Sequence, residues 1–250
     1  MRFLVVLIAV LISPILCFAE VGHIDVKRYK GNIGGNYEIA MVLCHLETES
    51  SKSELFGYYY YTKNKIPIFI KGYMDGVNYN LVEYLDNGKE NALFKGKLEE
   101  VDIKGKWIMN KKEMPFTLSK IVPVQDVDNV EVAIHTDKDS CLNKKFITEN
   151  LTTSGSIVIS KGKKEFDYKF SFDLFTIKEP IHFGNTEGLL KLHSSGLSYF
   201  EANPDAKDMS ENCILFFIFF KDRIFVYEYG EPSYLDFGMG VHAEGVYLRK

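Results

Sequence analysis

Apolar and polar residues alternate along much of the chain between positions 55 and 121. The pattern is clearest in the segment 101–107, where Val101, Ile103 and Trp107 share one side and the residues between them are charged or glycine. A period of two is what a strand with one buried and one solvated face requires. This segment therefore predicts a half-buried strand with Trp107 in a core.

Further runs of the same kind surround this strand. The predicted strands of this half cover residues 37–46, 55–61, 66–70, 77–81, 92–98, 101–107 and 114–121. Asp75-Gly76 and Asp86-Asn87-Gly88 separate neighbouring runs, and such pairs are strong hairpin signals. Pro67 cannot donate to a ladder, so it is expected at a strand start or an edge. No sustained helical period occurs, which predicts an all-β, antiparallel meander or barrel with little helix.

A weak internal repeat supports a meander. Residues 70–74, Ile-Lys-Gly-Tyr-Met, recur 24 positions later as Phe-Lys-Gly-Lys-Leu at 94–98. A short turn and an alternating strand follow each copy. The unit is interpreted as one hairpin, because it is too short and imperfect for a solenoid repeat.

The second half begins after a segment with a proline and clustered acids at 121–129, which is predicted to be the domain boundary. We expect a strand at 130–134, a loop at 136–153 and a regular core strand at 166–174. A glycine-containing, looser region follows, and exposed loop residues precede the last strands. Those last strands are predicted at 213–220, 223–229 and 241–248. The expected organisation is two β-rich domains, 20–122 and 130–250.

Two runs, Tyr58–Tyr61 and Phe216–Phe220, are apolar at consecutive positions. Exposed on an open sheet edge, such runs would invite aggregation. They therefore predict strands that are covered on both faces or closed into barrels.

Residues 1–19 have the pattern of a secretory signal peptide. Arg2 supplies the positive end, an apolar core follows, and Pro14 breaks it ahead of small residues at the cleavage site. We expect cleavage before Glu20, export to the periplasm or the medium, and no remaining transmembrane span. An uncleaved anchor and lipidation of Cys17 are the alternatives. The apolar core is too short for a spanning helix, and the residues before Cys17 lack the usual small side chain.

Charge and composition limit the function. The formal net charge is −4, and lysines and acidic residues are interspersed. Without a basic stripe the chain is not expected to bind nucleic acid as its main task. Hydrophobic residues make up 46% of the chain, enough for a core without disulfide staples.

Three cysteines remain after the predicted cleavage: Cys44, Cys141 and Cys213. An odd number in an exported chain leaves at least one thiol without a partner in the same chain. Apolar residues flank Cys44 and follow Cys213, which suits three buried core thiols. A Cys141–Cys213 disulfide in the second half is the alternative in an oxidising compartment.

No stretch carries a specific catalytic, cofactor or metal motif. His193-Ser194-Ser195-Gly196 lacks the first glycine of a nucleophile elbow and is interpreted as a polar turn. The six histidines lack metal-ligand spacing, and the acids of 135–139 lack the rest of a calcium loop. The glycines of Gly238-Met239-Gly240 resemble those of a phosphate-binding loop, but such a loop leads into a helix. A strand pattern follows here, so the segment is interpreted as a turn. Asn150-Leu151-Thr152 fits a glycosylation sequon, which matters only in a eukaryotic source.

The C-terminal segments Cys213–Phe216, Arg223–Val226 and Phe237–Tyr247 resemble the closing part of uncharacterised exported bacterial proteins. In those proteins a cysteine usually precedes the Phe-Gly pair and would join the cysteine at the Cys213 position. Asp236 stands there in this chain. The meander of 55–118 is similar to a segment of the same class. The resemblance implies an envelope or secreted protein with barrel-like domains and no particular activity.

The leading hypothesis is a non-enzymatic exported binding protein for a protein or a small apolar ligand, a class that includes inhibitors and protein-interaction modules. The 15 tyrosines and 19 phenylalanines could line a ligand cavity, although aromatic residues in strands more often form core. A hydrolase with dispersed carboxylates such as Glu83 and Glu99 is one alternative. A structural envelope component that associates through Cys44 or an exposed strand is another.

Overall fold

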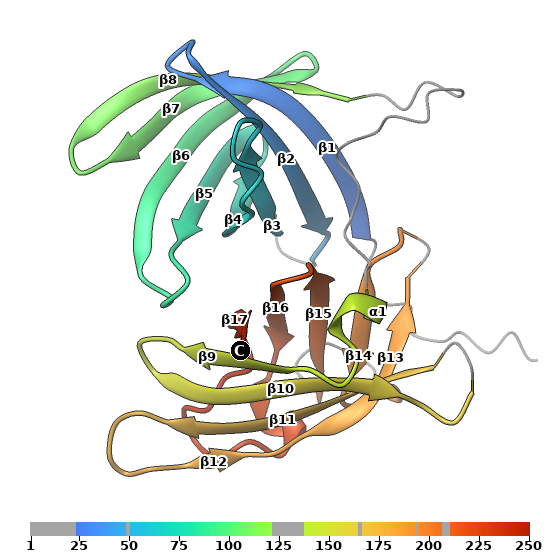
Figure 1. Cartoon of the computed structure of the whole chain (residues 1–250). Coiled ribbons are helices and arrows are strands. Elements are labelled where there is room, and N and C mark those ends of the chain that lie inside the picture. The colour runs from blue at the N-terminus through green and yellow to red at the C-terminus, as the bar shows by residue number, and fades with distance from the viewer. Residues whose placement is uncertain (1–23, 49–50, 122–137, 165–166, 194, 207–210) are drawn as a thin grey trace, which may run out of the picture.

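The structure is a computed structural model, and it describes residues 24–48, 51–121, 138–164, 167–193, 195–206 and 211–250. The predicted signal peptide (1–19), most of the predicted boundary (122–129) and the predicted strand at 130–134 lie outside the described residues. Within them, two antiparallel sheets each close into an eight-stranded barrel, so the all-β fold class is confirmed. Figure 1 shows the two barrels facing each other.

The first barrel is an up-and-down meander in which every strand pairs with its neighbours in the sequence. Pairing between its first and last strands, from Tyr29 opposite Lys120 to Ile33 opposite Phe116, closes it. Its strands are β1 (Ile24–Ile33), β2 (Tyr37–Leu46), β3 (Lys52–Tyr61), β4 (Ile68–Asp75), β5 (Asn78–Tyr84), β6 (Glu90–Glu99), β7 (Asp102–Met109) and β8 (Lys112–Lys120).

The second barrel has a less regular order, because the C-terminal strand β17 inserts between β9 and β16. The order is β10-β9-β17-β16-β15-β14-β13-β11, β10 pairs with β11 to close the barrel, and β12 adds to β11. Its elements are α1 (Lys138–Cys141), β9 (Lys145–Glu149), β10 (Thr153–Lys161), β11 (Tyr168–Thr176), β12 (Phe183–Gly184), β13 (Glu187–Leu192), β14 (Ser198–Glu201), β15 (Cys213–Phe219), β16 (Arg223–Gly230), the 3-10 helix η2 (Pro232–Leu235) and β17 (Gly245–Arg249).

Large side chains fill the interior of each barrel. In the first barrel Tyr29, Tyr59, Phe94 and Trp107 are among the buried residues of one cluster. In the second barrel the inner faces of β11 and β15 form a similar cluster. The prediction that Trp107 lies inside the first barrel is therefore confirmed.

A third cluster joins the barrels through the outer faces of β2 and β3 on one side and β15 and β16 on the other. Phe56 stacks on Tyr227 with ring centroids 4.2 Å apart, and it also stacks on Phe216 at 5.1 Å. These strands are buried on both faces, which explains why Tyr58–Tyr61 and Phe216–Phe220 do not alternate. The expectation of strands covered on both faces is confirmed.

The 24-residue repeat marks the first strands of two hairpins, β4–β5 and β6–β7, as predicted. Ile70 and Phe94 of the two copies both point into the barrel. A Cβ on Gly72, in the first copy, would lie 1.9 Å from the Asn80 carbonyl oxygen of the next strand. Only glycine fits this close approach between the two strands.

Several local predictions were wrong. Val101 is exposed in the turn before β7, while Ile103 and Trp107 point inward. The segment 136–153, expected to be a loop, contains α1 and β9. β9 has only two buried residues, Phe146 and Thr148, so its sequence pattern is weak. β1 was missed because polar residues occupy many of its positions and only Ile24, Tyr29 and Ile33 are buried; β10, β13 and β14 were missed as well.

Candidate functional site

A pocket of about 440 Å³ lies between the two barrels. Its walls come from β4, β5 and the β5–β6 turn of the first barrel, and from the β9–β10 turn, β16 and the entry to β17 of the second. The lining residues are Phe69, Lys71, Tyr84, Leu85, Gly88, Asn150, Leu151, Thr152, Glu228, His242, Glu244, Gly245 and Val246. Its size is within the usual range for sites that bind small molecules.

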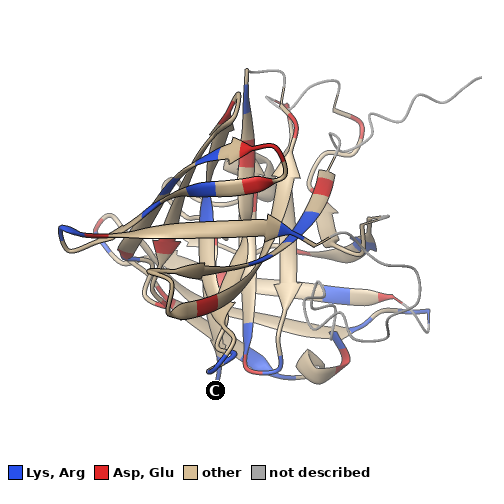
Figure 2. Ribbon diagram, turned by 90° about the horizontal axis from the view of Figure 1, so that it is seen from above, with Lys and Arg blue, Asp and Glu red and all other residues tan. Residues whose placement is uncertain are grey.

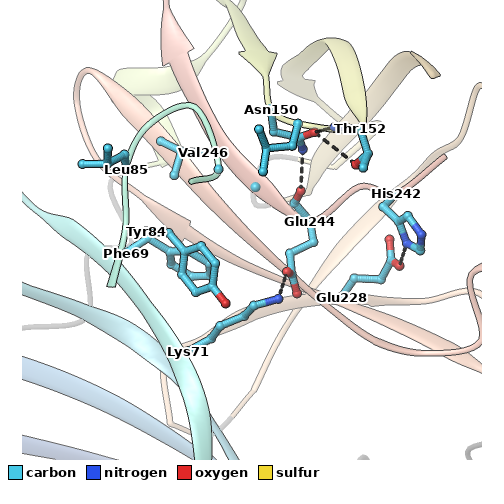
Figure 3. A pocket seen from close by; sticks show the side chains of 13 residues that line it. Phe69, Lys71, Tyr84, Leu85, Asn150, Thr152, Glu228, His242, Glu244 and Val246 are labelled. Carbon is cyan, nitrogen blue, oxygen red and sulfur yellow. Dashed lines mark hydrogen bonds and ion pairs between the residues drawn. The ribbon is translucent and has the colours of Figure 1, made fainter. Parts of the chain in front are cut away.

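The pocket has an apolar side and a charged side. Figure 3 shows Phe69, Tyr84, Leu85 and Val246 together on one side. Glu228 and His242 lie opposite, with Lys71 and Glu244 between the two sides. A ligand with an apolar body and a polar group would match both.

A second hollow of about 580 Å³ adjoins this pocket, and the two share Lys71, Tyr84, Glu228 and Glu244. It adds charged and polar residues from both barrels, including Glu54, Lys95 and Tyr227. The shared residues therefore stand where the two hollows meet.

Lys71 of β4 forms an ion pair with Glu244 of the other barrel. Burial raises the pKa of Glu244 above its usual value. Burial alone would lower the pKa of Lys71, but the Glu244 carboxylate more than offsets this and the pKa stands above its usual value. Both directions are typical of a partly desolvated site with negative potential.

Glu228 and His242 form a second pair in the pocket, which is an ion pair when the imidazole is protonated. Glu228 Oε1 lies 2.8 Å from His242 Nδ1, and Glu228 Oε2 accepts a 2.8 Å hydrogen bond from the backbone N–H of Ala243. The Glu228 side chain is 7% exposed and that of His242 48%. The hydrogen bond to Glu228 raises the pKa of His242. Glu228 thus orients an imidazole at the mouth of the pocket.

Asn150, the first residue of the sequon, holds the β9–β10 turn against the pocket. Its Oδ1 accepts from the backbone N–H groups of Thr152 at 2.9 Å and Thr153 at 2.6 Å. Its Nδ2 donates to the carbonyl oxygen of Glu244 at 3.4 Å. The amide that a glycan would modify is therefore engaged in the fold.

Polar contacts between the barrels fix the walls of the pocket. Arg223 of β16 donates to Asp86 in the β5–β6 turn at 3.0 Å and to the carbonyl oxygen of Pro67 at 3.4 Å. Tyr227 donates to Glu54 of β3. With the aromatic cluster between the barrels, these contacts preform the pocket.

The carboxylate pair suggested by the sequence is not brought together. Glu83 is buried in the first barrel and accepts hydrogen bonds from Tyr59 and Asn91. Glu99 is exposed and pairs with Lys104. Glu83 lies opposite Ala92, seven residues from Glu99 along β6, which corresponds to about 23 Å at 3.3 Å per residue. The pair therefore does not have the separation that glycosidase chemistry needs.

The other motifs are placed as turns. Ser195 Oγ lies 2.8 Å from His193 Nδ1 within the β13–β14 turn, where Gly196 N–H donates to the His193 carbonyl. The Gly238–Gly240 segment is also a turn, closed by a bond from Val241 N–H to Gly238. Residues 135–137 and Ser194 lie outside the described residues.

All three cysteines of the predicted mature chain are buried, and no disulfide joins them in the structure. Cys141 Sγ donates to the carbonyl oxygen of Phe220 at 3.3 Å. The Cys141–Cys213 bridge considered from the sequence is not formed. Burial raises the pKa of Cys44 to about 12, and its place in the cluster between the barrels leaves it no access to a second chain.

Most of the aromatic residues named above form core, but an apolar patch of Phe175 and Phe183 is exposed on the second barrel. Ile177, Ile181 and Met239 are further exposed apolar residues close to these two in the sequence or to the turn that pairs with Phe183. Phe175 and Phe183 lie opposite each other on β11 and β12, with ring centroids 6.5 Å apart. Exposed patches of this kind often mark protein-binding surfaces.

Basic and acidic residues are interspersed along the strands of both barrels, as Figure 2 shows. Among the described residues, no group of three or more histidine, cysteine or acidic side chains is placed to hold a metal ion. The same part of the chain contains no helix long and apolar enough to cross a membrane.

Comparison with known proteins gives no match: no protein-family model, no curated protein and no solved structure matches the chain. The resemblance to exported bacterial proteins therefore stays a prediction.

Sequence reasoning missed the four charged residues of the pocket. Lys71 and Glu244 are 173 positions apart, so no local motif could reveal them. The available signal was weak: Glu228 interrupts an apolar strand between two tyrosines, and His242 and Glu244 flank a buried alanine.

Proposed function

We propose that this chain is an exported binding protein that holds a small ligand in the pocket between its two barrels. The observation that carries the proposal is the amphipathic pocket itself, with Phe69 and Val246 on one side and Glu228 and His242 on the other. Side chains fill both barrel interiors, which favours the space between the barrels as the binding place. Export rests on the predicted signal peptide.

Binding fits the state of the charged groups. Lys71 already neutralises Glu244, and Glu228 is held by His242 and by a backbone N–H group. Because two hydrogen bonds already orient Glu228, this carboxylate can face a ligand with little reorganisation of its own on binding.

A screen of small amphipathic molecules by ligand-observed NMR tests the proposal on the mature chain. Leu151→Trp places a large ring at the pocket, where Leu151 is 53% exposed. Leu189→Trp is the matched control, since Leu189 is 52% exposed on β13 outside the pocket. We expect hits that bind the wild type and Leu189→Trp and not Leu151→Trp. No hit, or hits that bind Leu151→Trp equally, would contradict the proposal, and a hit recovered chemically changed would favour the hydrolase alternative.

A protein partner is the second candidate, favoured by the exposed patch around Phe183 and Phe175. Phe183→Ser would remove its largest exposed ring without opening the core. Capture of one protein by the wild type and loss of that capture by Phe183→Ser would support this function. Equal capture by both would count against it.

A further inference from the structure

Lys71 shows how the pocket holds an alkylammonium group. Its Nζ lies 5.2 Å from the ring centroid of Tyr84 and pairs with the Glu244 carboxylate of the opposite barrel. An aromatic face and a carboxylate are the two elements that commonly bind an organic cation. The same position would suit the ammonium group of a ligand.

The charges around this position favour a second cation over an anion. The pocket contains two carboxylates, Glu228 and Glu244, with Lys71 as the counter-charge and His242 as a further one when it is protonated. The adjoining hollow adds one charge of each sign, Glu54 and Lys95, so the excess of negative charge remains on Glu228 and Glu244. An anionic ligand that approached Lys71 would meet the like charges of these carboxylates, which is unfavourable in a partly desolvated site.

The Lys71 side chain can also move away from Glu244 toward a second carboxylate. Lys71 and Glu54 line the same adjoining hollow, so a second carboxylate lies on the side away from the pocket. The Lys71 side chain is partly exposed, and the four-carbon stem of a lysine is flexible, so the ammonium group can change position. Movement toward Glu54 would keep the lysine near a carboxylate and release Glu244.

We propose that the ligand of this pocket is an organic cation, a primary amine on an apolar body, whose ammonium group replaces that of Lys71 at Glu244. The apolar body then lies against Phe69 and Val246, on the opposite side of the pocket from His242. This inference rests on the proposed binding function and adds the chemical class of the ligand.

Three probes with the same body and different head groups test it: hexylammonium, hexanol and hexanoate, each titrated into the mature chain and followed by NMR. We expect hexylammonium to bind at least about fivefold more tightly than hexanol, and hexanoate to bind most weakly. Equal affinities, or tightest binding of hexanoate, would overturn the cation inference and leave the binding function standing. Absence of binding by all three would overturn both.

Two variants locate the effect. Glu244→Gln should raise the Kd of hexylammonium about tenfold, the usual range for loss of a charged partner, and leave hexanol unchanged. Lys71→Met removes the competing ammonium group and should lower the Kd of hexylammonium. Lys104→Met is the control, because Lys104 pairs with Glu99 on the surface of the first barrel. Weaker hexylammonium binding in Lys71→Met, or the same change in Lys104→Met, would refute displacement of Lys71.

Discussion

Trp107→Ala tests whether the first barrel is held together by its aromatic interior. Trp107 is 4% exposed and lies opposite Phe94 and Met114 on the neighbouring strands. Burying about 200 Å² of indole at about 25 cal/mol per Å² contributes about 5 kcal/mol. Trp107 Nε1 is buried without a hydrogen-bond partner, which offsets about 1–2 kcal/mol of this gain. We expect a loss of about 3–4 kcal/mol, within the usual range for Trp→Ala in a core.

Urea unfolding followed by far-UV circular dichroism measures this loss, because the variant lacks the only tryptophan and has no indole fluorescence. Trp107→Phe is the control: it keeps an aromatic ring and removes an N–H that has no partner, so it should cost only about 1–2 kcal/mol. A Trp107→Ala variant within about 1 kcal/mol of the wild type would refute the packing argument.

Three further predictions concern the interface and the histidines. Arg223→Met should lower the free energy of unfolding, measured in urea, by about 1–2 kcal/mol, because it removes charged hydrogen bonds between the barrels while Asp86 stays solvated. An unchanged urea midpoint would mean that this contact does not stabilise the fold. Burial lowers the pKa of His45 to about 4, so the unfolded chain binds more protons than the folded chain between about pH 4 and 6.5, and stability falls as the pH drops through that window. His45→Asn should remove about 2–3 kcal/mol of the stability change between pH 7.5 and 4.5, and an identical pH profile would contradict this. Since Glu228 raises the pKa of His242, the pair stabilises the fold fully below about pH 6.5 and less as the pH rises through the folded pKa. His242→Gln should therefore be more destabilising at pH 5.5 than at pH 9, and the reverse order would contradict the pairing.

The parts of the fold that the sequence predicts best are those with a simple division between water and core. β11 has Phe170, Phe172 and Leu174 inside and polar residues between them, so its pattern is clear. The continuous apolar run of β15 indicated burial on both faces, although it could not indicate which strands would cover it. In the structure its outer face packs against the first barrel.

The rest depends on information that local patterns lack. β9 offers only Phe146 and Thr148 to the interior, so it resembles a loop in sequence. The pocket brings Lys71 and Glu244 together from different barrels. The order of the second barrel, with β17 between β9 and β16, decides that contact, and no short-range pattern encodes it.

The most direct test of the proposed binding site is an amide chemical-shift map of the isotope-labelled mature chain titrated with the strongest small-molecule hit. We predict that the shifted amides surround the pocket and come from both barrels, including Lys71 and Tyr84 of the first barrel and Glu228 and Glu244 of the second. Shifts confined to the outer surface of one barrel, away from these residues, would contradict binding between the barrels.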